Sequence, residues 1–336
     1  MKYLHLFIAG ICIISCTVYS CASGVDEAAA AILGKNSEAP VFLSCKAVSA
    51  SEINFEFSLP VKVMSVFFNP EVKLEEVEDG SIVRVIYSEG PGPGEKLTAD
   101  LLAEDENGNT INVLIPLMTR NDRIPNLIIT ELRTENSKPK SEFIEFKTLS
   151  EGNLGAMRIF VSGNNKEPLL YTFPPIEASK GEYVTLHLRT TESNCINELG
   201  KNLEESGGPD SSPTGRDLWI PGNTKLLHKT DVIYFLDQDD NVLDALMLSE
   251  NNDPWWNKEY FAEAAEFLFS KNAWKSPDGK ICGPAEAVQS TGTTATRTIN
   301  RDETKSEKSG TALDWYITAT SCATPGKPNN VKRYVP

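Results

Sequence analysis

The chain has 336 residues, of which 40% are hydrophobic, so it is long enough to bury the cores of two or three domains. Acidic residues outnumber basic ones by 47 to 32, which gives a formal net charge of −15. This excess argues against a nucleic-acid partner, which needs a concentrated basic face, and against direct adhesion to anionic lipid headgroups.

The first 21 residues have the pattern of an export signal. Lys2 supplies a positive charge, and the uncharged, mostly apolar run 6–19 is too short to span a bilayer. Residues 17–21 place small residues before Cys21 and resemble a lipobox, in which the cysteine is acylated. The segment 13–16 offers Cys16 as an alternative lipidation site, and an ordinary signal peptide is a further alternative. We expect an extracytoplasmic chain, lipid-anchored to the cell membrane or the outer membrane.

Residues 22–39 are small and polar, which predicts a flexible tether. Residues 40–120 then show short apolar runs separated by turn signals, and we expect about seven strands that form an Ig-like β-sandwich. Two of these strands are predicted at 53–59 and 61–66, where apolar and polar residues alternate. The segment 97–110 resembles the late strands of bacterial Ig-like modules, which end at an acidic D-x-x-G-N hairpin.

A polar junction at 119–125 precedes a second series of strand-like blocks, and its shortness leads us to expect some freedom between two domains. The blocks are Leu127–Leu132, Ser141–Phe146, Leu154–Met157, Tyr171–Pro175, Lys180–Leu186, Asp231–Asp237 with Asn241–Asp244, Thr298–Arg301, and Asp314–Trp315 with Thr324–Asn329. In this order they resemble the lamin-tail domain, although Ala156 and Met157 depart from its pattern. The resemblance implies an Ig-like β-sandwich over 125–330, with insertions at 191–225 and 250–294.

The sequence therefore predicts an all-β chain of two β-sandwich domains, the second with a short helical insertion. Asp253 and Pro254 are typical of a helix start, and an apolar stripe follows at helical spacing, which is formed by Phe261, Ala264, Ala265 and Leu268. Several aromatic residues lie off this stripe, and we predict that they bind a partner. The alternative is that they fill the gap between helix and sheet. These residues are Trp255, Trp256, Phe267, Phe269 and Trp274.

Acidic clusters raise the question of metal binding or catalysis. Glu131, Glu142 and Glu145 lie close in sequence, but no histidine accompanies them and the lamin-tail pattern has these acids without catalysis. A second cluster is typical of solvated turn formers, and we predict no metal there and no cofactor. The alternative for this cluster is a calcium site. This cluster consists of Asp237, Asp239, Asp240 and Asp244.

Four cysteines follow the signal segment, and an oxidising compartment permits disulfides among them. We predict a disulfide between Cys195 and Cys282, because each lies in a long insertion and both insertions are expected at one end of the sandwich. Cys45 is predicted to be a small buried hydrophobe.

The predicted function is that of a non-enzymatic, lipid-anchored envelope protein that binds a protein or another envelope component through its sandwiches. The alternative is an extracytoplasmic hydrolase or a nuclease-associated accessory protein. The length of the chain favours the binding function over the hydrolase, because no stretch the size of a catalytic domain remains once both sandwiches are counted.

Overall fold

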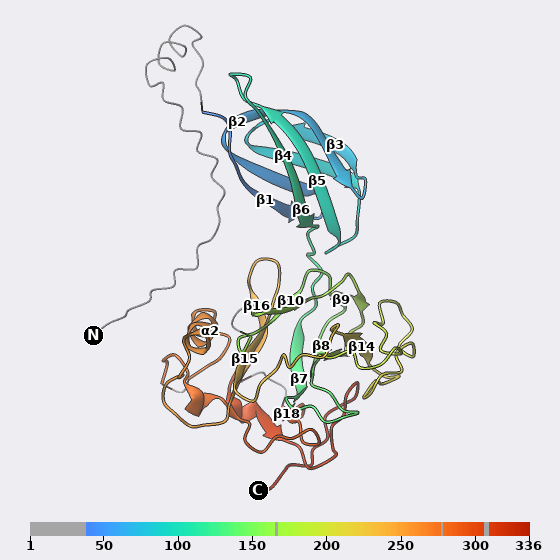
Figure 1. Ribbon diagram of the computed structural model, residues 1–336, viewed down its shortest axis with the longest axis vertical. Coiled ribbons are helices and arrows are strands. Elements are labelled where there is room, and N and C mark those ends of the chain that lie inside the picture. Colours follow the sequence, from blue (N-terminus) through green and yellow to red (C-terminus); the bar gives the residue numbers. More distant parts are fainter. Residues whose placement is uncertain (1–37, 165–166, 277, 306–308) are drawn as a thin grey trace, which may run out of the picture.

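The computed structural model describes residues 38–164, 167–276, 278–305 and 309–336 (Figure 1). The predicted signal peptide and both candidate lipidation cysteines, Cys16 and Cys21, lie outside these residues. Strands dominate the described chain, so the predicted all-β class is confirmed. No helix in the described ranges is long and apolar enough to cross a membrane.

The first unit has six strands and not seven, because the two strands predicted at 53–59 and 61–66 are one continuous strand, β2. Pro60 lies within it, at the point where β2 changes its neighbours. Residues before Pro60 pair with β1 and β4, and residues after it pair with β5. The strands are β1 (Phe42–Ser49), β2 (Glu52–Asn69), β3 (Lys73–Glu78), β4 (Gly80–Glu89), β5 (Lys96–Glu104) and β6 (Thr110–Met118).

This change of partners closes the first sandwich around its own core. Alternate residues of β2, including Ile53 and Phe55, are fully buried, while Glu56 between Phe55 and Phe57 faces solvent. Leu97 and Leu101 on β5, which pairs with the later part of β2, complete the same core. The described chain enters this unit at the end far from the second unit and leaves it after β6 at the near end (Figure 1).

The second unit is built from two facing sheets and a separate two-stranded ribbon. One sheet has the order β11-β10-β15-β16-β17, the other has the order β14-β13-β8-β7-β18-β19, and β12 pairs with β9. The strands are β7 (Leu127–Arg133), β8 (Phe143–Thr148), β9 (Gly152–Asn153), β10 (Arg158–Val161), β11 (Leu169–Thr172), β12 (Glu177–Ala178), β13 (Tyr183–His187), β14 (Arg216–Trp219), β15 (Asp231–Leu236), β16 (Val242–Ser249), β17 (Val288–Gln289), β18 (Ile299–Arg301) and β19 (Trp315–Ile317).

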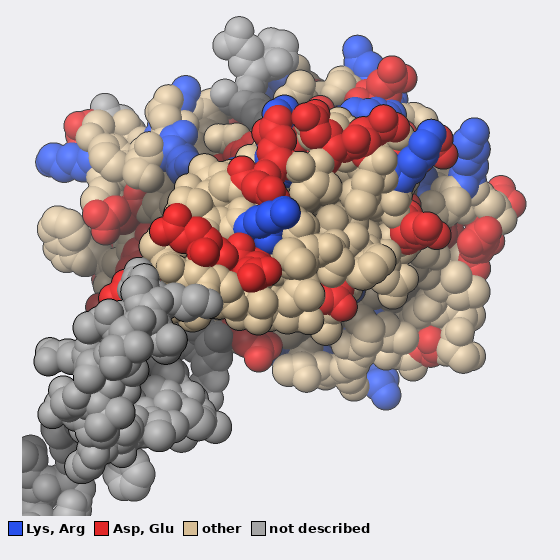
Figure 2. Space-filling view, turned by 90° about the horizontal axis from the view of Figure 1, so that it is seen from above, with Lys and Arg blue, Asp and Glu red and all other residues tan. Residues whose placement is uncertain are grey.

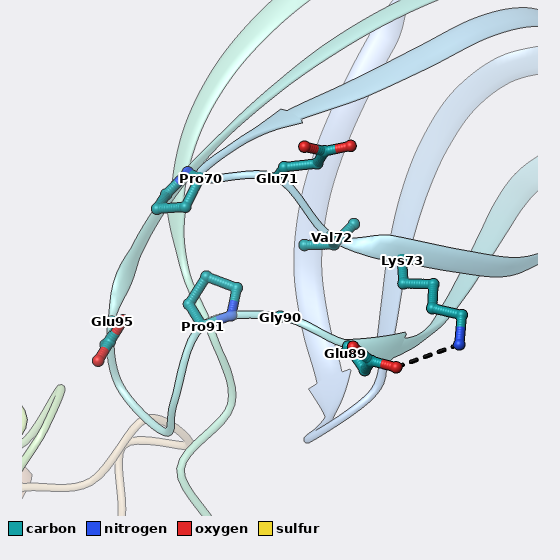
Figure 3. Close-up of a pocket in the computed structure, with 8 residues that line it drawn as sticks. All are labelled: Pro70, Glu71, Val72, Lys73, Glu89, Gly90, Pro91 and Glu95. Carbon is teal, nitrogen blue, oxygen red and sulfur yellow. Dashed lines mark hydrogen bonds and ion pairs between the residues drawn. The ribbon is translucent and has the colours of Figure 1, made fainter.

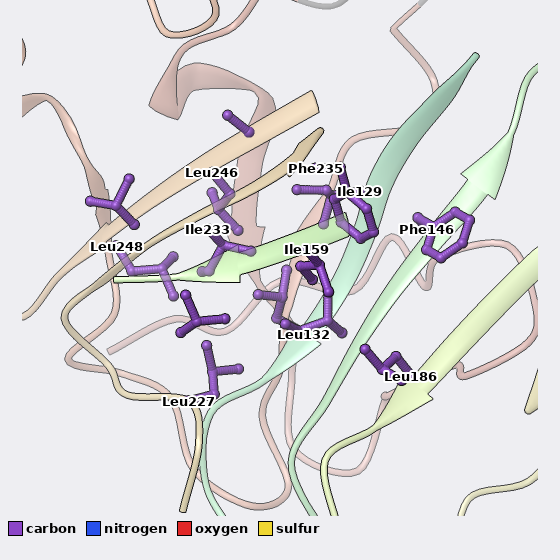
Figure 4. Close-up of a cluster of buried hydrophobic side chains, with 14 of the residues drawn as sticks. Ile129, Leu132, Phe146, Ile159, Leu186, Leu227, Ile233, Phe235, Leu246 and Leu248 are labelled. Carbon is purple, nitrogen blue, oxygen red and sulfur yellow. The ribbon is translucent and has the colours of Figure 1, made fainter. Parts of the chain in front are cut away.

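A single apolar core fills the space between these two sheets (Figure 4). Phe146 on β8 lies 5.6 Å from the ring of Phe173 and 5.2 Å from that of Phe235, both edge-on. Aromatic rings prefer this arrangement, so the contacts add to the free energy that burial supplies. β13 is buried along its whole length, and β8 is buried at every residue except Lys147.

The two predicted insertions contain more regular structure than their composition indicates. The segment 191–225 includes β14, which pairs in parallel with β13 at the sheet edge. The segment 250–294 includes β17, the 3-10 helix η1 (Pro284–Glu286) and the helix α2 (Glu259–Ser270). A second 3-10 helix, η2 (Ala312–Asp314), precedes β19.

Helix α2 confirms the predicted apolar stripe, because the residues it buries are Phe261, Ala264, Ala265 and Leu268. Its predicted start is wrong. The helix begins at Glu259, five residues after Pro254, because the preceding segment hydrogen-bonds to η1. The carbonyl of Asp253 accepts a hydrogen bond from the amide of Ala285, which holds this segment extended.

The junction between the units is hydrogen-bonded to the second unit. The buried Asn121 donates its side-chain amide to the carbonyls of Asn153 and Gly155, at 2.9 and 2.7 Å. Gln238, in the β15–β16 turn, accepts from the amide of Asn121 and donates to the carbonyl of Thr119. The polar composition of 119–125 therefore reflects hydrogen bonds to the second unit and not only exposure to solvent.

Candidate functional site

The five aromatic residues predicted to bind a partner are divided by the structure between core and surface. Trp274 is 2% exposed and donates its indole N–H to the carbonyl of Glu286, so it belongs to the core. Phe267 is half-buried on α2 and lies 5.3 Å from the ring of Tyr234 on β15. These two rings fill the space between helix and sheet, which was the alternative interpretation.

Two others are open to solvent. Trp255 is 79% exposed and Phe269 is 41% exposed. Trp256 is intermediate, because its ring packs on Phe261 at 5.5 Å and its indole N–H donates to the carbonyl of Cys282 at 2.9 Å. Of the five predicted contact residues, Trp255 and Phe269 are thus the two that are exposed enough to contact a partner. We call the surface formed by these two residues and helix α2 the α2 surface.

A first hollow of about 430 Å³ opens beside the start of α2. Cationic side chains line it together with amides, a hydroxyl and two carboxylates. Lys225 pairs with Glu135 at 3.2 Å, and Lys229 lies 3.9 Å from Glu250. Its lining residues are Glu135, Gly163, Lys225, His228, Lys229, Thr230, Glu250, Asn251, Asn257, Lys258, Tyr260 and Phe261.

A buried carboxylate, that of Asp231, lies beside His228 in this hollow and accepts a hydrogen bond from the backbone amide of His228 at 3.1 Å. Asp231 is fully buried and accepts hydrogen bonds from the amides of Gly163 and Val232, at 2.8 and 3.0 Å. Its second oxygen lies 3.7 Å from Nδ1 of His228. Burial raises the pKa of Asp231, while its hydrogen bonds lower it. Because Nδ1 faces Asp231, the other ring nitrogen, Nε2, is the one left for a ligand.

A second hollow of about 210 Å³ lies along the side of α2 and shares Tyr260 with the first. Its floor is aromatic, since Tyr234 and Phe267 line it. The ring of Tyr234 also stacks on Phe160 at 5.2 Å, nearly parallel. A row of three rings therefore runs from β10 across β15 to α2, and it fixes this side of the α2 surface.

The first unit contains a larger hollow, of about 530 Å³, between the β2–β3 and β4–β5 connections (Figure 3). Pro70 and Pro91 face each other across it, and Lys73 pairs with Glu89 at one side. The hollow is lined by three glutamates and this one lysine, which is already paired. Acidic side chains also outnumber basic ones on the face seen in Figure 2. We therefore place the candidate site on the α2 surface.

The second acidic cluster is explained by ion pairs and hydrogen bonds at the junction and in the core. Asp239 pairs with Lys46 of the first unit and with Arg120 of the junction. Hydrogen bonds from Arg120 hold the pKa of Asp239 well below its usual range. The other three carboxylates have partners of their own. Asp237 accepts from the amides of Asp239 and Asn241, Asp240 pairs with Arg158, and Asp244 pairs with Arg301. No metal-ligating group of three or more side chains occurs in the described ranges.

The first acidic cluster lies inside the second sandwich. Glu131 and Glu145 are opposite each other on β7 and β8, and both are fully buried. Glu131 accepts hydrogen bonds from Thr324, and Glu145 accepts one from the amide of Gly326 at 2.5 Å. Glu142 instead forms an ion pair with Arg189. Glu131 and Glu145 thus fasten the chain after β19 to the sheet.

The predicted disulfide between Cys195 and Cys282 is absent, and both thiols are free in the structure. The premise that both insertions lie at one end of the sandwich is wrong. Cys195 precedes β14, at the edge of one sheet, and Cys282 precedes β17, at the edge of the other. In Figure 1, α2, from the insertion that contains Cys282, lies on the opposite side of the unit from β14. Cys45 is half-buried at the margin of the first core, and burial raises its pKa to about 12.

Comparison with known proteins places the second unit in a family. Residues 125–317, more than half of the chain, match the family TP_1001_2nd, described as "protein second domain". The chain belongs to this family. The family's domain spans β7 to β19, so it includes α2 and both hollows beside it. The first unit and the junction before residue 125 lie outside the match.

A relative from Treponema pallidum (strain Nichols) is described only as an uncharacterized protein. It is 27% identical over 147 residues, which cover 42% of this chain and 37% of the relative. The match thus spans little more than a third of the relative's length.

Reasoning from the sequence missed the first hollow. The spacing of His228 and Asp231 is the signal that points to a histidine beside an acid, but the pair lies at the start of β15 and no motif surrounds it. Lys225 and Lys229 belong to the loop between β14 and β15, and Lys258 comes from the other insertion, so their proximity depends on the fold.

Proposed function

We propose that the chain is a non-enzymatic envelope protein, anchored by a lipid at its N-terminus, that binds a protein or another envelope component through the α2 surface. The apolar run before Cys21, with Cys16 as the alternative, supports the anchor. The lamin-tail resemblance of residues 127–329 supports an interaction or attachment role.

The observation that carries the proposal is the exposure of Trp255, 79%, next to a half-buried Trp256 and the two hollows along α2. Burying a large aromatic side chain in a partner is favourable, and tryptophan is among the residues that contribute most to interfaces. A largely exposed tryptophan in the segment that leads into α2 has the arrangement expected of a contact residue.

The test replaces Trp255 and Phe269 by Ala in the mature protein. Both side chains are exposed, so the melting temperature should stay near that of the wild type, since surface substitutions change stability by about 0.5 kcal/mol or less. Capture of the partner from envelope extracts should fall by roughly 30-fold or more, the effect of losing a hot spot worth about 2 kcal/mol.

Leu114→Ala is the matched control, because Leu114 is 70% exposed on β6 of the first unit. It should leave capture unchanged. Equal capture by the W255A/F269A variant and the wild type would contradict the proposed contact, and loss of capture by the Leu114 variant would move the contact to the first unit.

A further inference from the structure

The first hollow combines three kinds of groups. Lys225, Lys229 and Lys258 bring three positive charges to one cavity, and His228 adds a ring nitrogen. The carboxylates of Glu135 and Glu250 oppose only two of these charges. The lining thus has three lysines against two carboxylates, with the buried Asp231 beside His228, so the hollow can attract an anion more strongly than the acidic remainder of a chain whose net charge is −15.

The three lysines differ in how they are engaged. Lys225 and Lys229 each have a glutamate nearby, whereas Lys258 is exposed and no partner is seen for it in the described chain. An ammonium group binds phosphate as a point charge, and it can do so from a flexible side chain. Lys258 is therefore the lysine most available to a ligand, and Lys229 lines the same hollow.

The hollow is also larger than a bare ion requires. A volume of about 430 Å³ lies within the range of sites for small molecules. Asn251 and Asn257 supply amides that both donate and accept, Thr230 supplies a hydroxyl, and the two glutamates are acceptors for ligand hydroxyl groups. Tyr260 adds a ring at the margin that can cover the carbon skeleton of a ligand.

From these features we infer that the first hollow binds a phosphorylated polyol or sugar, with the phosphate against Lys229, Lys258 and His228 and the hydroxyl groups toward the glutamates and amides. The lysines supply the attraction, and the acceptors select a ligand that carries hydroxyl groups. The inference goes beyond the proposed partner contact and does not depend on it, because it uses neither Trp255 nor Phe269.

The test measures binding of glycerol 3-phosphate to the mature chain by isothermal titration calorimetry, with glycerol and inorganic phosphate as comparison ligands. Saturable binding of glycerol 3-phosphate, weaker binding of phosphate and none of glycerol are expected. Lys258→Gln alone should weaken binding several-fold, and the K229Q/K258Q variant about tenfold or more, because each variant removes charged hydrogen-bond donors. Since Lys258 is exposed, its replacement leaves the fold intact.

Lys73→Gln with Lys280→Gln is the charge-matched control, because both lysines are exposed and neither lines the hollow. This control should bind like the wild type, and so should the W255A/F269A variant. A parallel measurement with phosphatidylglycerol vesicles asks whether the polyol phosphate comes from a lipid headgroup. Binding to either source that requires Lys229 and Lys258 supports the inference.

The absence of saturable binding to glycerol 3-phosphate and to the vesicles would overturn it. Equal binding by the K229Q/K258Q variant and the wild type would overturn it as well. Neither result affects the proposed partner contact, which is read from capture by the W255A/F269A variant. Conversely, loss of that contact leaves the calorimetric result unchanged, so the two failures are distinguishable.

Discussion

Asp105 and Asp237 perform the same task in the two units. Asp105 accepts hydrogen bonds from the amides of Asn107 and Asn109 and from the side chain of Asn109, each at 2.8 Å. Asp237 accepts the corresponding three bonds from Asp239 and Asn241. Both acids therefore close a hairpin in the pattern Asp-x-x-x-Asn, which explains their clustering with asparagine without a calcium ion.

Glu131 and Glu145 place two buried carboxyl groups opposite each other in the second unit. Burial raises the pKa of both, and the charge of Glu131 raises the pKa of Glu145 further. Two like charges on opposed residues of paired strands repel each other, so the pair favours a state in which one carboxyl is protonated. The hydrogen bonds from Thr298, Thr130 and Gly326 limit this cost.

This pair predicts that stability falls as the pH rises. A carboxyl whose pKa is raised by folding contributes stability that is fully present below its ordinary pKa of 4.5 and is lost as the pH rises through the folded value. Within that window the free energy of unfolding should fall by about 1.4 kcal/mol per pH unit for one such group. Glu145→Gln should flatten this dependence, which urea unfolding at pH 5 and pH 8 can measure.

Gln fits the site because its amide can donate to Thr130 while its oxygen still accepts from Gly326 and Thr185. The control is Glu76→Gln, at an exposed position of β3. An unchanged pH slope in the Glu145 variant would show that Glu145 does not titrate in this window.

At the scale of elements, the sequence predicts strands and one apolar stripe well and predicts helix and loop boundaries poorly. The alternation at 53–59 and the stripe of α2 are local patterns, and both appear as expected. The union of 53–59 and 61–66 in one strand depends on partners far along the chain, β4 and β5, and is not encoded locally. The start of α2 is delayed for the same reason.

The candidate site likewise has a part that the sequence predicts and a part that depends on the fold. Aromatic residues around 255–269 can be recognised from composition, but whether Trp255 or Trp274 is exposed depends on packing against the sheet. The disulfide prediction failed because it needed the relative position of two insertions, which only the strand order determines. The proximity of the lysines in the first hollow could not be predicted for the same reason, because it depends on how the two insertions fold.

The junction is the element that decides how the two units move relative to each other. We expect Asn121→Ala to loosen it, because the carbonyls of Asn153 and Gly155 lose their donor, at a cost of about 1–3 kcal/mol. ¹⁵N relaxation should then show the two units tumbling with different correlation times. Asp122→Ala is the control, since Asp122 is exposed and its ion pair is with the neighbouring Arg120 of the same junction. Identical tumbling of the Asn121 variant and the wild type would contradict this role.

At the scale of the whole molecule, the proposed anchor makes a prediction about location. Cys21→Ala should abolish acyl labelling and move the protein from the membrane fraction to the soluble fraction, because stable anchoring needs the multiple acyl chains of a lipoprotein. Cys16→Ala is the matched variant and should leave labelling unchanged. The opposite pattern would assign the lipid to Cys16, and labelling of neither would contradict the anchor.

The path of the chain through the first unit has a mechanical consequence for an anchored protein. The chain enters at the far end of this unit, starts β1 there, and leaves at the end of β6 nearest the second unit (Figure 1). If the N-terminus is tethered and the second unit is held by a partner, tension runs parallel to the strands. The hydrogen bonds between β1 and β2 then carry the load together in shear and are not opened one after another, so the unit is built to withstand a pull along its length.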